Sequence, residues 1–436
     1  MIVLTDMDTR RSFLRKLAAG GLAASLAFPL RKALSSWSLD ASALSRPDGG
    51  SPEDEDYWRL VREHFPLTTE RTYFNNGGLG PSPRIVLETY REACLRLEKI
   101  CETGHEEVGA VRAKAASFLG CEPTEIAFTR NTTEGMNIIA WGLPLRKGDE
   151  VVTSTHEHPG GAIPWLAVAK EKGVVVRLFE PAKTKDENLR IIERSVTRKT
   201  RVLSLSHITC TTGLLFPVKE VSALCRQRGI WLVLDGAHPP GMIPVDLHGC
   251  GCDFYATSGH KWLLGPKGTG LLYIRKEMSD VWRPTYVGAY SDAKYDLDTL
   301  TLEYRREAEV TEYGTRNTPL ILALGAAFDF LGAIGMPRVA ARGRFLAELL
   351  KKELAATPTV EILTPMEQDS AASIVTFRPT EMKTSALLDA LNREGFRVRS
   401  VGEHRLDAVR VSVHVYTSVA EVEHFCHTVR RITSGA

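Results

Sequence analysis

Short apolar runs alternate with helical patterns along residues 71–275, and this alternation restricts the fold more than any other feature of the chain. The runs are too short for core helices and are rich in Val, Ile and Leu, as strands buried on both faces are. Strands separated by helices predict a mainly parallel sheet covered on both sides. The predicted strands are 125–128, 150–153, 174–178, 202–205, 231–234, 254–256 and 270–274, and the helices between them include 135–142, 163–172 and 218–228.

A second α/β pattern follows towards the C-terminus. A long apolar helix is predicted over 320–331, and strands are predicted near 373–377, 396–399 and 409–415. We therefore expect a large α/β domain over 71–320 and a smaller C-terminal α/β domain over 321–436. A linker and N-terminal segment over 44–70 and an export signal over 1–43 are expected to precede them.

Composition narrows the class of protein. The 436 residues are 43% hydrophobic and 25% charged, which is typical of a soluble globular protein with room for two domains. A formal net charge of +2, without basic runs interleaved with aromatic residues, argues against a nucleic-acid binder. The eight cysteines are scattered, and the close pair Cys250 and Cys252 is too tightly spaced and isolated for a zinc site, so no metal centre is predicted.

The first residues resemble a twin-arginine export signal. Arg10 and Arg11 lie in a Thr-Arg-Arg-Ser-Phe-Leu sequence, and the mildly apolar stretch 17–28 that follows is shorter than a membrane span. The alternative is a short amphipathic helix or an N-terminal arm. The signal would make the twin-arginine export machinery a partner during targeting and would place the mature protein in the periplasm or otherwise outside the cytoplasmic membrane.

Two strand ends carry the residues that point most directly to chemistry. The strand 231–234 ends in Asp235-Gly236-Ala237-His238, and the strand 254–256 leads into Ser258-Gly259-His260-Lys261. A lysine amine can form a Schiff base with pyridoxal 5'-phosphate (PLP), and a carboxylate can pair with the protonated pyridine nitrogen and keep the ring an electron sink. Either short sequence alone is a weak signal, but the two together predict PLP as the cofactor, with Lys261 and Asp235 as catalytic residues.

A phosphate site is predicted where the strand 125–128 runs into a helix. Thr132 and Thr133 lie at this helix N-terminus, where backbone N–H groups and hydroxyls can bind an anion. The alternative is that Asn131 and these threonines only cap the helix. Ser258 and His260 are further candidate phosphate donors.

Histidines follow other strands of the same sheet. His158, after the strand 150–153, can stack over a pyridine ring. A competing hypothesis makes His156, His158 and His238, with Asp235, a metal site, but it leaves Lys261 and the threonine pair without a role.

In the last domain, alternation over 409–414 places Arg410, Ser412 and His414 on one face of a strand. An arginine that points inward can hold a carboxylate with two parallel hydrogen bonds. The alternative is a solvated arginine on the sheet surface.

Taken together, these motifs resemble the class V aminotransferase family of fold type I, which includes cysteine desulfurases, selenocysteine lyases and isopenicillin N epimerase. The resemblance covers about residues 70–430 and implies a homodimer with shared active sites. It implies that Thr315 reaches the phosphate of the neighbouring subunit, that His238 lies near the phenolic oxygen of PLP, and that Arg410 holds the substrate carboxylate. The remaining site residues that it implies are Asn75, Asn76, Thr132, Thr133, His158, Asp235, Ser258, His260 and Lys261.

Two departures bear on the reaction. Desulfurases carry a nucleophilic cysteine on a loop before the last strands, whereas the corresponding stretch 397–404 contains none. In addition, Cys210 stands where desulfurases place an asparagine. The opening Asn-Asn-Gly-Gly sequence at 75–78 and the Tyr-Gly-Thr-Arg-Asn sequence at 313–317 favour the isopenicillin N epimerase-like branch.

The resulting expectation is an exported, homodimeric PLP enzyme that acts at the α-carbon of an amino acid or modified peptide, as an epimerase or aminotransferase does. Lys261 is expected to remove the α-proton. One alternative is a C–S or C–Se lyase. Another, from a different class, is a cofactor-binding protein without turnover.

Overall fold

The computed structural model describes residues 44, 45 and 50–435. The predicted export signal lies outside these residues. Among the described residues, no single helix is long and apolar enough to cross a membrane. One bent pair, α12 (Thr318–Ile334) and α13 (Met336–Ala355) with 77° between them, passes that test by length and composition only.

The central sheet has seven strands in the order β2-β8-β7-β6-β5-β3-β4. The five strands from β7 to β4 are parallel, and β8 runs antiparallel to both β7 and β2. This confirms the expected mainly parallel α/β fold. The strands are β2 (Ile126–Thr129), β3 (Glu150–Ser154), β4 (Val175–Phe179), β5 (Thr200–Ser206), β6 (Trp231–Asp235), β7 (Phe254–Ser258) and β8 (Gly270–Ile274).

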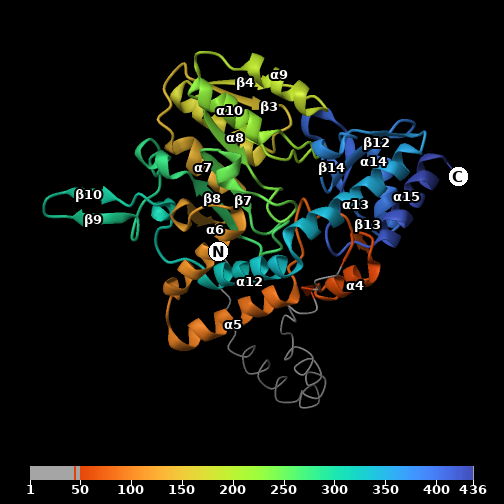
Figure 1. Cartoon of the computed structure of the whole chain (residues 1–436), viewed down its shortest axis with the longest axis horizontal. Coiled ribbons are helices and arrows are strands. Elements are labelled where there is room, and N and C mark those ends of the chain that lie inside the picture. The colour runs from red at the N-terminus through yellow and green to blue at the C-terminus, as the bar shows by residue number, and fades with distance from the viewer. Residues whose placement is uncertain (1–43, 46–49, 436) are drawn as a thin grey trace, which may run out of the picture. The chain divides into compact units, whose positions relative to one another are not determined.

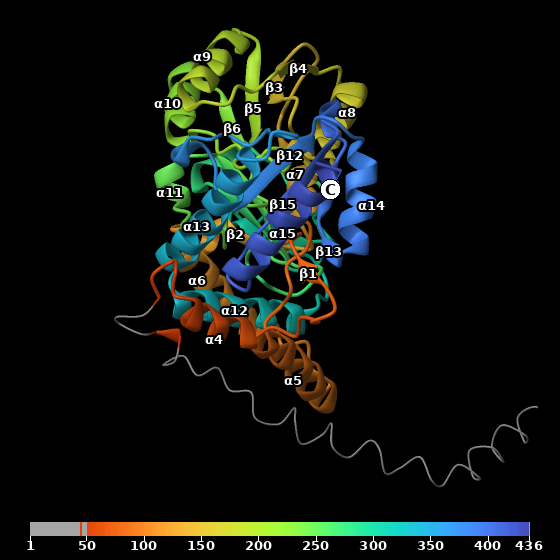
Figure 2. The ribbon, with the colours of Figure 1, turned by 90° about the vertical axis from the view of Figure 1, so that its right-hand side faces the viewer.

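Helices alternate with these strands and bury their apolar residues. Met136 and Ile139 of one helix and Trp165 of the next pack with Val151 and Val233 in one core cluster. Two further helices, α5 and α12, run side by side (Figures 1 and 2). The helices of this part are α5 (Arg84–Ile100), α6 (Val108–Leu119), α7 (Thr132–Gly142), α8 (Pro159–Lys172), α9 (Lys185–Ser195), α10 (Val218–Arg228) and α11 (Leu247–Cys250).

A smaller antiparallel sheet, in the order β11-β12-β15-β14, forms from the C-terminal part of the chain. Its apolar face packs with helices around Phe377, Val411 and Phe425 in a core of its own. Figure 2 shows α14 and α15 beside this sheet. The elements are β11 (Val360–Ile362), β12 (Ile374–Pro379), α14 (Thr384–Arg393), β13 (Phe396–Arg397), β14 (Arg399–Val401), β15 (Ala408–Ser412) and α15 (Val419–Thr433).

The first described helix and strand pack against this C-terminal part. The strand β1 (Thr72–Tyr73) pairs in parallel with β13. In α4 (Glu55–Glu63), the guanidinium of Arg62 bonds the carboxylate of Glu421 on α15, with nitrogen to oxygen distances of 2.5 and 2.8 Å. The domain boundaries stay a prediction.

A two-stranded hairpin was not predicted from the sequence. It consists of β9 (Asp292–Asp296) and β10 (Thr301–Tyr304) and projects away from the rest of the described chain (Figure 1). Because no residue of either strand is buried, its sequence carries no alternation between buried and exposed positions.

A buried ion pair fastens the segment after the hairpin to the edge of the central sheet. Arg112 on α6 donates to both carboxylate oxygens of Glu312, at 2.6 and 2.9 Å. One of these oxygens also accepts the backbone N–H of Phe128 on β2 at 2.6 Å. The two side chains are only 8% and 3% exposed, and they belong to a small network in which Arg112 also meets Glu309 and Glu312 also meets Arg316.

We expect Glu312→Gln to lower the free energy of unfolding by about 3–5 kcal/mol, because it leaves the buried Arg112 without its full countercharge. Urea-induced unfolding, followed by circular dichroism, measures the change. The matched control is Glu309→Gln, since Glu309 meets the same arginine at 3.1 Å but is 31% exposed. That variant should cost about 1 kcal/mol or less. An equal decrease in the free energy of unfolding in the two variants would contradict the conclusion that Glu312 is the main countercharge of Arg112.

Candidate active site

A cavity of about 230 Å³ lies at the carboxyl ends of the central strands, where ligands bind in open α/β sheets. It brings together eight of the residues predicted for the site. They are Thr132, Thr133, His158, Asp235, Ser258, His260, Lys261 and Arg410.

Lys261 follows β7 and is enclosed by the loop before α5. The backbone N–H of Gly80 donates to the carbonyl of His260 at 2.8 Å, and a side chain at Gly80 would collide with the carbonyl oxygen of Lys261. Burial lowers the pKa of the Lys261 amine below its ordinary value, and the nearby Asp235 opposes this shift. The amine is therefore easier to deprotonate than that of an exposed lysine.

Asp235 is the last residue of β6, and the backbone just after this strand fixes the orientation of its carboxylate. Its Oδ1 accepts the backbone N–H of Ala237 at 3.0 Å. Burial raises the pKa of Asp235, while the charge of Lys261 and this N–H oppose the shift. Gly161 of α8 allows a close approach, since a Cβ there would lie 2.8 Å from Asp235 Oδ2.

The residues predicted from the sequence to bind a phosphate lie at the N-terminus of α7 and at the end of β7. Asn131 caps this helix by accepting the N–H of Glu134 at 2.9 Å. The capping role left open in the sequence therefore falls to Asn131 and not to the threonines. Thr132 Oγ1 lies 2.7 Å from Ser258 Oγ, which joins the helix terminus to the end of β7. These hydroxyls and the N-terminus of α7 together fit a phosphate group, and we call them the phosphate cradle.

His260 lies beside this cradle but faces a carbonyl. Its Nδ1 is 3.1 Å from the backbone oxygen of Thr269, so Nδ1 carries the proton that this carbonyl accepts. Burial lowers the pKa of His260. To donate to a phosphate, Nε2 must therefore take up a second proton.

His158 and His238 are held as neutral rings with the proton on Nε2. In His158, Nδ1 accepts the N–H of Gly160 at 3.0 Å, and burial lowers its pKa to about 4. In His238, Nδ1 accepts the indole N–H of Trp262 at 2.9 Å, and burial lowers its pKa well below the usual value. The Nε2 of His238 is buried and has no hydrogen-bond partner among the described residues. Its N–H group can therefore donate a hydrogen bond to an acceptor atom of a bound ligand.

Arg410 reaches the cavity from β15 of the small sheet. Its Nη1 donates to the carbonyl of Cys210 at 2.7 Å and its Nη2 to Asn75 Oδ1 at 3.2 Å. Its Nε has no hydrogen-bond partner within the described chain. Burial, followed by the charge of Arg399, lowers the pKa of Arg410 to about 10, so it stays protonated at neutral pH.

Four predicted residues, His238 among them, are not among those that line the cavity. Asn75 lies behind Arg410, as the bond above shows, and Asn76 is buried with its Oδ1 3.2 Å from the hydroxyl of Tyr416. Thr315 is exposed and lines a separate pocket of about 500 Å³ with Arg316.

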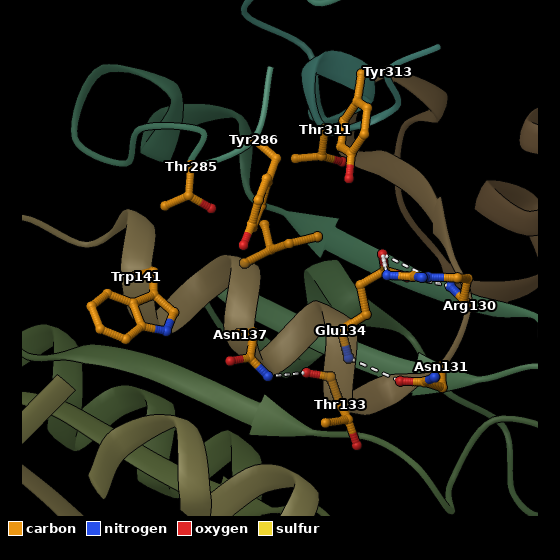
Figure 3. A pocket seen from close by; sticks show the side chains of 11 residues that line it. Arg130, Asn131, Thr133, Glu134, Asn137, Trp141, Thr285, Tyr286, Thr311 and Tyr313 are labelled. Carbon is orange, nitrogen blue, oxygen red and sulfur yellow. Dashed lines mark hydrogen bonds and ion pairs between the residues drawn. The ribbon is translucent and has the colours of Figure 1, made fainter. Parts of the chain in front are cut away.

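Another pocket, of about 630 Å³, adjoins the phosphate cradle (Figure 3). Thr133 lines both this pocket and the site cavity. Tyr286 and Tyr313 lie on its opposite wall, with their rings stacked 6.3 Å apart.

Arg399 lines the cavity but was not recognised as a site residue from the sequence, whereas Gly77 belongs to the Asn-Asn-Gly-Gly sequence noted there. Arg399 on β14 is the register partner of Arg410, and its Nη1 has no hydrogen-bond partner in the part of the chain described. Gly77 leaves room between the sheets, because a Cβ there would lie 2.9 Å from Ser412 Oγ and 3.1 Å from Arg410 Nη2. The pairing of β14 with β15 brings the two arginines together. This pairing cannot be predicted from the spacing of residues along the chain.

Cys210 lines the cavity but is not activated. Burial raises the pKa of its thiol to about 11, although the charges of Arg410 and Arg399 oppose the shift. A thiol in this state is a poor nucleophile at neutral pH. Its contribution to the site is its carbonyl, which holds Arg410.

The competing metal site is not assembled. Among the described residues, no group of three or more His, Cys, Asp or Glu side chains could hold a metal ion. His156 instead bonds the hydroxyl of Thr211 through Nδ1 at 3.1 Å.

The residues of the cavity fit PLP. A buried lysine, a carboxylate and a phosphate cradle line one space. The unpartnered His238 Nε2, Arg399 Nη1 and Arg410 Nε provide donors for an oxygen-rich ligand.

Comparison with known proteins agrees with this geometry. A family model, Aminotransferase class-V, matches residues 94–425. The chain is 30% identical over 396 residues to a probable cysteine desulfurase of Pyrococcus abyssi, covering 86% of this chain and 96% of the relative. It is 31% identical over 395 residues to the isopenicillin N epimerase of Amycolatopsis lactamdurans, covering 86% and 98%.

Solved structures of the cystine C–S lyase C-DES have the same fold. In complex with its reaction product cysteine persulfide, that protein matches with a TM-score of 0.78 and 28% identity, over 84% of this chain and 99% of its own. A mutant of C-DES with glycine covalently linked to the PLP cofactor matches with a TM-score of 0.79 and 27% identity, over 85% and 98%. The chain described here belongs to the class V aminotransferase family of PLP-dependent enzymes of fold type I.

Proposed function

We propose that this enzyme acts at the α-carbon of an amino acid, or of an amino-acid residue in a modified peptide, by moving the α-proton without breaking a C–S bond. The observation that carries this proposal is that Lys261, Asp235 and Arg410 line one cavity. The thiol of Cys210, which also lines it, is not activated, and this disfavours the persulfide-forming reaction of a desulfurase. When bound, PLP supplies an electron sink for the negative charge that develops at the α-carbon.

Lys261 is the base in this proposal. A general base works best when its pKa lies near the working pH, and burial moves the pKa of Lys261 in that direction. Lys261 follows β7 and the phosphate cradle lies at the N-terminus of α7, and both line the same cavity in which PLP would be held.

Asp235 is proposed to hold the protonated ring nitrogen. Buried and close to Lys261, its carboxylate needs a cation to compensate its charge. The neutral His158 ring can lie against an aromatic ring without adding charge, since its pKa is about 4.

Arg410 is proposed to bind the substrate carboxylate. Arg410 lines the cavity, and Gly77 has no side chain that would crowd its guanidinium. Hydrogen bonds to Cys210 and Asn75 fix the orientation of the guanidinium. Preorganised N–H groups on a planar guanidinium bind carboxylates in a two-pronged way.

A C–S or C–Se lyase is the second candidate. It is supported by the cysteine desulfurase relatives and by the likeness to C-DES, whose reaction product is cysteine persulfide. A desulfurase that forms a persulfide on its own cysteine is disfavoured, because the stretch 397–404 has no cysteine and the Cys210 thiol stays protonated.

The holoenzyme, incubated in D₂O with a panel of L-amino acids and L-cystine, should replace the α-proton of its substrate by deuterium and lower its optical purity. Nuclear magnetic resonance follows the exchange, and chiral chromatography follows the configuration. Release of sulfide or of a persulfide from L-cystine, with no α-deuterated amino acid recovered, would instead identify a lyase.

Two variants serve as controls in this experiment. Lys261→Ala should abolish exchange. Arg410→Lys keeps a positive charge but loses the two-pronged geometry, so KM should rise by about tenfold or more, which corresponds to about 1.4 kcal/mol. The absorbance of the cofactor should survive in Arg410→Lys. An unchanged KM would remove Arg410 from the substrate site.

We further propose that the enzyme is a homodimer in which Thr315 of each copy serves the phosphate cradle of the other. Thr315 is exposed, and the pocket that adjoins the cradle is bordered by Tyr286 and Tyr313, which are 70% and 42% exposed. Exposed aromatic residues next to a binding site are typical of interfaces.

Sedimentation velocity should therefore give the mass of a dimer, and Tyr286→Asp should shift the protein towards the monomer by placing a charge in the interface. The control is Leu178→Asp, which adds the same charge at a 64% exposed position on β4, at the other edge of the central sheet. A monomeric wild-type protein would contradict the proposal.

Export through the twin-arginine route is proposed on the sequence of residues 9–14 alone. A route for folded proteins would deliver the enzyme with PLP already bound. Changing Arg10 and Arg11 together to Lys should keep an active, full-length enzyme in the cytoplasm, as cell fractionation would show. Continued export of this variant, or wild-type protein found wholly in the cytoplasm, would contradict this proposal.

A further inference from the structure

Glu157 is a buried carboxyl that the reaction described above does not use. It immediately precedes His158 and is 8% exposed. Its Oε1 accepts the hydroxyl of Ser154 at 2.5 Å, and its Oε2 accepts the hydroxyl of Ser206 at 2.6 Å. Within the described residues, no lysine, arginine or histidine forms an ion pair with it. A buried carboxyl held by two hydroxyls and no cation is costly to ionise.

The position of Glu157 connects it to Asp235. Ser206 ends β5 and is the register partner of Asp235 on the neighbouring parallel strand β6. The hydroxyl that binds Glu157 therefore stands beside the residue proposed to hold the cofactor's ring nitrogen. Burial is the main cause that raises the pKa of Glu157 to about 7, and the charge of Asp235 adds to it while the two serines oppose it.

We propose that Glu157 is a positioning residue for Asp235, a buried carboxyl whose loss of a proton strengthens the hold of Asp235 on the protonated ring nitrogen of PLP. This inference rests on the role of Asp235 proposed above. A second negative charge next to Asp235 favours a proton on the ring nitrogen, and it acts strongly because solvent screens little in a buried site. The coupling is reciprocal, so binding of the cationic ring favours release of the proton from Glu157.

The other titratable groups around Glu157 do not change charge in the same pH range. The histidines nearest in the chain and directly after β5 are neutral, since burial lowers the pKa of His158 and of His207 to about 4 and also lowers that of His156. On β7, the pKa of Tyr255 is raised well above its usual value. Lys261 interacts with Asp235 from the segment after β7. Because the wild type and the Glu157 and Ser154 variants all keep Lys261, its titration affects PLP binding equally in all of them.

The test compares the pH dependence of PLP affinity in the wild type, Glu157→Gln and Ser154→Ala. Apoprotein is titrated with PLP at several pH values from 5 to 9, and binding is followed by absorbance. Titrations of PLP itself are common to all three proteins, so the ratio of wild-type to Glu157→Gln affinity isolates the glutamate. We expect this ratio to rise with pH around a midpoint near 7, by about tenfold for each unit by which PLP lowers the pKa of Glu157.

Ser154→Ala keeps the carboxyl and removes one of its two hydroxyl donors. Because that hydrogen bond favours the ionised form, the midpoint should move to higher pH in this variant and should not disappear. A purely structural role for Glu157 would instead lower affinity by the same factor at every pH. Identical pH profiles in the wild type and both variants would overturn the inference.

Stability of the apoprotein provides a readout that needs no cofactor. The unfolded state loses the proton of Glu157 near pH 4.5, whereas the folded state keeps it until about pH 7. The free energy of unfolding should therefore fall between these values more steeply in the wild type than in Glu157→Gln, and the difference should stay constant above them. Parallel curves would count against the inference.

Asp235→Asn separates the two proposals. If this substitution changes neither PLP affinity nor the absorption spectrum, the proposed role of Asp235 fails, and the inference on Glu157 fails with it. If Asp235→Asn weakens PLP binding while Glu157→Gln leaves the pH profile intact, only the inference on Glu157 is overturned.

Discussion

The shape of the candidate active site depends on the hydrogen bond between the guanidinium of Arg410 and the carbonyl of Cys210. This hydrogen bond of 2.7 Å joins a strand of the small sheet to the segment that follows β5 of the central sheet. It is buried, so its loss would leave a charged donor without an acceptor in a space closed to water. Asn75, before α5, completes the contact, and three distant parts of the chain thereby meet at one side chain.

The central sheet and much of the cavity could be predicted from the sequence, for one physical reason. Parallel strands buried on both faces appear as apolar runs, and their carboxyl ends lie at one edge of the sheet. Residues directly after such runs, such as Asp235 and Lys261, must then lie near each other. The same argument does not reach Glu157, because its significance comes from two serines on different strands and not from a pattern along the chain.

Features that depend on pairing between strands escaped prediction. Arg399 enters the cavity because β14 pairs with β15 in a register that sets it opposite Arg410. The hairpin formed by β9 and β10 is fully outside the core, so no burial pattern reveals it. Asn75 and Asn76 were predicted as site residues by resemblance, but only the structure gives their contacts, which are to Arg410 and Tyr416.

The pairing of β1 with β13 has a consequence for how the chain folds. Thr72 and Phe396 are register partners although they lie at opposite ends of the described sequence, so this contact closes a very long loop. Contacts of this kind form late, because the entropy of loop closure must be overcome before they stabilise anything. During synthesis, β1 leaves the ribosome long before its partner exists. The large sheet can form while the chain is still growing, but the mouth of the cavity cannot be completed until almost the whole protein has been made.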